Sequence, residues 1–104
     1  MTRRRLPNRR SALSFELEAA GLRYTCTVGK FDDGALAEIF ISNGKAGSDS
    51  DTAARDSAVV ASIALQYGVP LEVIRHALMR NRDGSACGPL GAALDLLHEL
   101  EEER

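Results

Sequence analysis

Hydrophobic and polar residues alternate along the first third of the chain. From Leu13 to Glu18 every second side chain is apolar, and this period of two predicts a strand with one buried face. The alternation returns from Arg23 to Phe31 and from Ala37 to Ser42. Ala20-Gly21 and Asp32-Asp33-Gly34 separate the strands, because Gly accepts positive φ and Asp hydrogen-bonds to nearby backbone. The pattern predicts an antiparallel meander with one wet face.

The second half of the chain changes to helical spacing. Asp49 or Asp51 can cap a helix that runs from about Thr52 to Tyr67, with Gly68 just past its end. Two further helices are predicted to open at prolines; Pro70 is followed by Leu71, Ile74 and Leu78, and Pro89 by Leu90, Leu94, Leu97 and Leu100. The expected fold class is therefore α+β, a three-stranded antiparallel sheet packed against three helices.

The 104 residues suit one domain. We expect a basic arm over residues 1–12, a single α+β domain over 13–100 and an acidic tail over 101–104. Five arginines and no acid occur in the first ten residues, whereas the rest of the chain has 8 basic and 15 acidic residues. The arm is formed by Arg3, Arg4, Arg5, Arg9 and Arg10. It either grips phosphate or an acidic partner, or only serves solubility and self-complementary contacts.

Several classes of protein are disfavoured by composition. Cys26 and Cys87 are too few for a disulfide framework, and Cys26 falls on the inner face of a strand. No signal peptide and no run long enough to span a membrane are recognised, so a cytoplasmic location is expected. His76 and His98 are isolated from other ligands, and we expect no metal site and no cofactor.

A glycine-rich loop follows the third predicted strand and offers a candidate anion site. Gly44, Lys45, Gly47 and Ser48 precede a helix N-terminus, where free N–H groups and the helix dipole attract anions. The spacing is not that of a Walker A loop. The alternatives are a nucleotide or phosphate site and a sharp turn between strand and helix.

Two other patterns carry chemistry. The segment 63–77 imitates a helix-turn-helix, whose second helix would offer Glu72, Arg75, His76 and Arg80 to a DNA groove. Cys87 precedes Pro89 at a helix start, a position that favours a reactive thiolate. A helix-turn-helix regulator of DNA and a small thiol enzyme are therefore alternative hypotheses.

Three stretches together resemble a known family. They are residues 3–7 (Arg-Arg-Arg-Leu-Pro), residues 24–25 (Tyr-Thr) with residues 38–41 running into the loop 44–48, and residues 62–72, which contain Leu-Gln-Tyr-Gly-Val-Pro-Leu-Glu. In this order they resemble the C-terminal TSCPD-type domain of adenosylcobalamin-dependent (class II) ribonucleotide reductases. The Thr-Ser-Cys-Pro-Asp motif of that domain is echoed by residues 85–89.

The resemblance implies a role connected with deoxyribonucleotide synthesis. Reductases of that family need a ten-stranded barrel, a thiyl-radical cysteine and a B12 site, which 104 residues cannot supply. We therefore expect no complete enzyme and no catalytic residue of its own. The resulting hypothesis is a free-standing accessory domain that binds a reductase, a nucleotide or nucleic acid through the loop 44–48 and the arginine arm, with a homodimer also expected.

Overall fold

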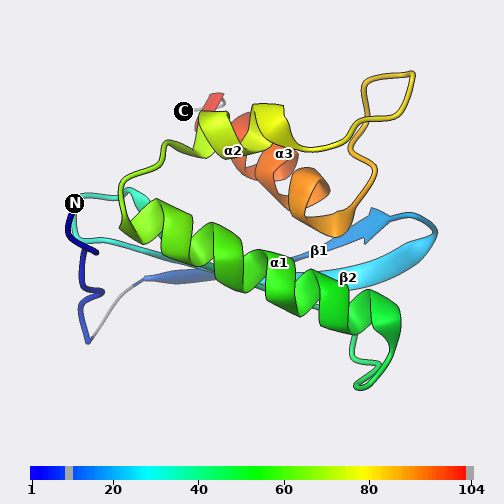
Figure 1. Ribbon diagram of the computed structural model, residues 1–104, viewed down its shortest axis with the longest axis horizontal. Helices are drawn as coiled ribbons and strands as arrows, with labels where there is room; N and C mark the ends of the chain where they lie inside the picture. Colours follow the sequence, from blue (N-terminus) through cyan, green and yellow to red (C-terminus); the bar gives the residue numbers. More distant parts are fainter. Residues whose placement is uncertain (9–10, 103–104) are drawn as a thin grey trace.

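The computed structural model describes residues 1–8 and 11–102, and the side chains as far as residue 101. The elements follow in the order β1 (Ala12–Ala19), β2 (Leu22–Lys30), β3 (Leu36–Ser42), α1 (Asp49–Gln66), α2 (Leu71–Ala77) and α3 (Pro89–Glu102). The strands form one antiparallel sheet in the order β1-β2-β3. The helices lie together on one side of it (Figure 1). The predicted α+β fold class is confirmed.

The sheet has two chemically different faces, as the alternation predicts. The buried face is built from alternate residues of all three strands, and its fully buried side chains include Cys26, Val28 and Ile39. The opposite face is mainly polar, with a hydrogen bond between Ser14 and Thr27, and it exposes Phe40. The tight turn between β1 and β2 places both Ala20 and Gly21 at positive φ, which permits a short hairpin with the twist of the strands.

The two longer helices close the core over different strands of the sheet. α1 packs along β3, and α3 packs over β1. Small alanines of α1, Ala54 and Ala58, lie against the sheet, while α3 contributes Leu94 and Leu97. By contrast, α2 has no fully buried residue, so the core depends mainly on the two longer helices.

A polar stripe on α1 closes the outer edge of β3. The backbone N–H of Ile39 donates to Ser62 Oγ at 2.8 Å, and Gln66 Nε2 donates to the carbonyl oxygen of Ala37 at 3.0 Å. At the other end, the N–H of Asn43 donates to Asp51 Oδ1 at 2.9 Å. Because unpaired backbone groups at a sheet edge invite further strands, these three side chains explain why α1 carries polar residues on its buried side.

The helix boundaries differ in detail from the sequence predictions. α1 begins at Asp49 rather than near Thr52, and its cap is Ser48, whose hydroxyl accepts the N–H of Asp51. The prediction that an aspartate caps the helix was therefore wrong; Asp51 instead turns back toward the end of β3. Gly68 lies past the helix with φ +92°, as expected. Within the described residues, no helix combines the length and the apolar character needed to cross a membrane.

Candidate functional site

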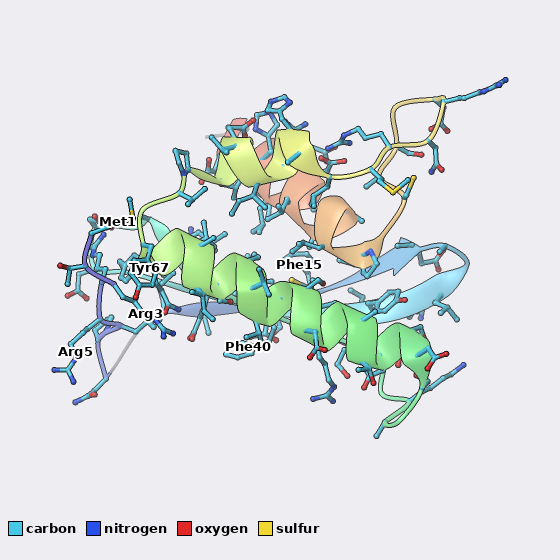
Figure 2. All side chains as sticks on the ribbon, in the orientation of Figure 1. Met1, Arg3, Arg5, Phe15, Phe40 and Tyr67 are labelled. Atoms are coloured by element: carbon cyan, nitrogen blue, oxygen red, sulfur yellow. The ribbon has the colours of Figure 1, made fainter. Side chains whose placement is uncertain are left out.

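The N-terminal arm is docked against the C-terminal end of α1. The Arg3 Nε donates to Gln66 Oε1 at 2.6 Å, and the backbone N–H of Arg4 donates to the carbonyl oxygen of Gln66 at 2.7 Å. Gln66 is itself buried and bonded to β3. One amide side chain therefore connects the arm, the helix and the sheet. Figure 2 shows Arg3 at this end of α1, where Tyr67 also lies.

The next two arginines have different surroundings. The guanidinium of Arg4 stacks on the ring of Phe31, 3.9 Å from its centroid, and pairs with Asp33 at 3.0 Å. Arg5 points away from the ribbon (Figure 2) and is exposed. The predicted site residues Arg9 and Arg10 lie outside the described residues. Arg3 has a neutral amide as its partner, and among the described residues neither Arg3 nor Arg5 forms an ion pair with an acid.

Two grooves meet at Arg4 and Gln66. One, of about 500 Å³, is lined by Arg3, Arg4, Arg5, Leu6 and Gln66. The other, of about 510 Å³, runs past Phe31 and Leu36 to the Tyr67–Leu71 turn, with Glu101 at its rim. A basic groove and a mainly apolar one thus share Arg4 and Gln66 as lining residues. Their size suits a small ligand.

The glycine-rich loop uses many of its polar groups internally. The Ser48 hydroxyl donates to the carbonyl oxygen of Lys45 at 2.7 Å, the Lys45 N–H donates to Asn43 Oδ1, and the Gly44 N–H donates to Ser42 Oγ. Gly44 and Gly47 both have positive φ, which a residue with a side chain adopts at a cost. These bonds are those of a sharp turn between strand and helix, one of the two interpretations of the sequence.

The carboxylate of Asp51 places a negative charge next to this loop. Its carboxylate is buried and accepts hydrogen bonds from Asn43 N–H, Ser42 Oγ and Arg55 Nε. The backbone hydrogen bond from Asn43, helped by Arg55 and Ser42, lowers the pKa of Asp51 below its ordinary value of about 3.9. A carboxylate therefore already occupies the space near the helix start that an anion would favour.

The structure does not bring the two predicted binding elements together. The arm contacts the last turn of α1, and the glycine-rich loop precedes its first turn (Figure 1). α1 has 18 residues, so about 27 Å separates its ends at 1.5 Å per residue. A mononucleotide cannot touch both, and the arm and the loop are separate candidates.

The charged side chains predicted for a DNA groove are engaged in contacts within the protein. Arg75 Nε and both terminal nitrogens of Arg80 bind the carboxylate of Asp95 at 2.7–2.8 Å. Glu72 accepts from Arg75 and pairs with His98 at 2.8 Å and with His76 at 3.2 Å. These contacts tie α2 to α3.

Cys87 lies at the end of a short hairpin that joins α2 to α3, in which Arg80 and Ala86 form an antiparallel bridge. Its Sγ donates to Asn81 Oδ1 at 3.2 Å, and it lines a groove of about 390 Å³ together with Leu78, Met79 and Pro89. Cys26 differs, since burial in the core raises the pKa of its thiol to about 12. Among the residues described, no three His, Cys, Asp or Glu side chains are grouped so as to hold a metal.

The two arm-side grooves are lined by the same segments that carry the family resemblance, residues 3–6 and 66–71. The family model described as "TSCPD domain" matches residues 3–99. The chain belongs to the TSCPD domain family.

Curated relatives of this TSCPD domain are described as vitamin B12-dependent ribonucleotide reductases. The Rhodopirellula baltica protein is 39% identical over 80 residues, which are 77% of this chain and 8% of the relative. The Agrobacterium fabrum protein is 39% identical over 70 residues, 67% of this chain and 6% of that one. The chain thus spans less than a tenth of the reductases it matches. No solved structure matches it significantly.

The sequence predicted the arginines of the arm-side grooves but not the residues that complete them. Gln66 and Tyr67 were noted only as part of a motif, and Phe31 only as the end of a strand. A signal was present for Gln66, because it lies four residues after Ser62 on a helix face whose other buried residues in that half of the helix are alanines and Leu65. Polar residues on a buried face need partners, which could have indicated a contact.

Acid should weaken the fold through Asp51. Because the folded pKa of Asp51 is lowered, its contribution to stability is present above about pH 4 and is lost as the pH falls through the lowered value. We expect Asp51→Asn to melt at a lower temperature at pH 7 and to lose less further stability between pH 5 and pH 2 than the unchanged protein. Thermal unfolding followed by circular dichroism measures both.

The control is Asp49→Asn, an exposed aspartate in the same first turn of α1. It should leave the acid dependence close to that of the unchanged protein. An acid dependence of Asp51→Asn equal to that of the unchanged protein would contradict the role of this carboxylate.

Proposed function

We propose that this TSCPD domain is an accessory binding domain of ribonucleotide reduction, without catalysis of its own, and that its ligand is a nucleotide. The observation that carries the proposal is the junction at Gln66, where the basic groove of the arm meets the mainly apolar groove beside Tyr67. A nucleotide combines a flat, largely apolar base with an anionic phosphate. The mainly apolar groove suits the base, and the basic groove beside it suits the phosphate.

The arginines suit the phosphate end of such a ligand. A guanidinium donates two parallel hydrogen bonds to phosphate oxygens, and among the described residues Arg5 forms no ion pair with an acid. On the other side, Tyr67 is 39% exposed, which leaves part of its ring available to a base. Aromatic side chains bind bases by stacking. Glu101 at the rim of this groove would disfavour phosphate there and leave it to the arginines.

The test is calorimetric titration with ribonucleoside and deoxyribonucleoside 5′-phosphates. We expect Arg5→Glu to weaken binding at least tenfold, about 1.4 kcal/mol, because it reverses a charge beside the phosphate. Binding should also weaken with added salt, since exposed charges are screened. The matched control is Arg82→Glu, an exposed arginine in the hairpin between α2 and α3, which should bind as the unchanged protein does.

Two results would redirect the proposal. Absence of heat with every nucleotide would remove the small ligand. A loss caused by Lys45→Ala but not by Arg5→Glu would move the site to the glycine-rich loop. The link to a reductase is tested separately, by assaying a purified B12-dependent reductase with and without this protein; a change in its rate or nucleotide dependence is expected.

A further inference from the structure

The two edges of the sheet are treated differently by the fold. The outer edge of β3 is closed by Asp51, Ser62 and Gln66 of α1, which bind its backbone groups. β1 forms the other edge, and it is bonded to β2 on one side. Within residues 1–8 and 11–102, no backbone group of another segment is bonded to the outer side of β1.

β1 also lacks the usual protection of an edge strand. Such strands are commonly kept short, kinked by a bulge or proline, or given an inward-pointing charge. β1 has eight residues and pairs with β2 without a break in register. Its inward positions are all apolar: Leu13, Phe15, Leu17 and Ala19.

The start of β1 exposes an apolar side chain. Leu13 is 44% exposed although it belongs to the inward set of β1. The small hollow of about 180 Å³ that it lines with Leu100 of α3 also reaches Leu36 of β3 and Leu71 of α2, so it lies under the end of the sheet. A neighbouring strand with its own inward leucines would cover the exposed part of Leu13 and bond to the edge at the same time.

We infer that β1 pairs antiparallel with β1 of a second copy of this chain, which joins two sheets into one of six strands. A two-fold axis at Phe15 sets Leu13 of one copy opposite Leu17 of the other, and Ser14 opposite Glu16. Apolar residues then meet apolar residues, and no two carboxylates stand opposite each other. A centre at Glu16 would oppose like charges, which is unfavourable.

The acidic residues of β1 do not oppose this pairing. Glu16 and Glu18 point to the polar face and lie 3.8 and 3.6 Å from Arg23 of β2. Arg23 therefore offsets one of the two negative charges within their own sheet. The contact is isologous, with the same strand used by both copies, as in most homodimers.

Sedimentation velocity over a range of concentrations tests the dimer. The unchanged protein should show a species of twice its 11.2 kDa. Leu13→Lys places an inward-pointing charge at the edge and should raise the dimer dissociation constant by about tenfold or more. Val60→Lys is the matched control, since Val60 is an exposed apolar residue on α1; it should leave the dimer intact.

Hydrogen exchange of the unchanged protein gives a second measurement that needs no variant. The β1 amides that are not bonded to β2 should exchange more slowly as the protein concentration rises. A monomer at every concentration would overturn the inference. So would a dimer that dissociates with Val60→Lys but survives Leu13→Lys, because the contact would then lie on the exposed face of α1.

Discussion

Replacing Gln66 with alanine is expected both to destabilise the fold and to release the N-terminal arm. The substitution removes the donor to the buried carbonyl oxygen of Ala37 and the acceptor of Arg3. A buried polar group left without its partner costs about 1–3 kcal/mol. Unfolding in urea measures the loss, and the rate at which trypsin cleaves after the arm arginines measures the release.

A second variant separates the two effects. Gln66→Glu keeps an acceptor for Arg3 but cannot donate to Ala37, so it should lose stability while the arm stays protected from trypsin. Thr52→Ala, an exposed position on the same helix, is the control for both measurements. If trypsin cleaves Gln66→Ala no faster than the unchanged protein, the Gln66 amide does not hold the arm in place. The proposal that this contact fixes the arginines of the basic groove would then be wrong.

Replacing Leu94 with alanine should cause a larger loss of stability. Leu94 is fully buried within the cluster that joins α3 to the sheet. Truncation of a buried leucine removes its transfer free energy and leaves a cavity, and together these cost about 2–5 kcal/mol. The total free energy of unfolding of a small domain is about 5–15 kcal/mol. A sizeable fraction of the variant should therefore unfold on mild heating.

The control for Leu94 is Val73→Ala. Val73 lies on α2 and is 59% exposed, so its truncation should change the free energy of unfolding by no more than about 0.5 kcal/mol. Urea unfolding of both variants gives the comparison. A loss below about 1 kcal/mol for Leu94→Ala would mean that α3 is not anchored through this side chain.

Two surfaces of this TSCPD domain are proposed to bind partners. The curated relatives are reductases of which this chain matches a small part. The arm-side grooves are the proposed nucleotide site, and the β1 edge is the proposed contact with a second copy. They lie on different elements, so each can be disabled without the other.

The order and type of the elements were determined by the sequence alone. Alternation from Leu13 to Glu18 and from Arg23 to Val28 leaves one apolar face per strand, and only a sheet buries such a face. Gly68 and Pro89 mark a helix end and a helix start by local backbone geometry. These signals are local, because each depends on neighbours a few residues apart, and the motif of residues 62–72 likewise needed no fold to be recognised.

Only the tertiary structure decided which residues meet. Arg3 reaches Gln66 across 63 positions of the chain, and Ser62 and Gln66 close β3 because α1 packs along that strand. The same packing places the arm and the glycine-rich loop at opposite ends of α1, although the sequence offered both for one ligand. Such contacts depend on the position at which an 18-residue helix packs against the sheet. The burial of the whole core fixes that position, and no local pattern encodes it.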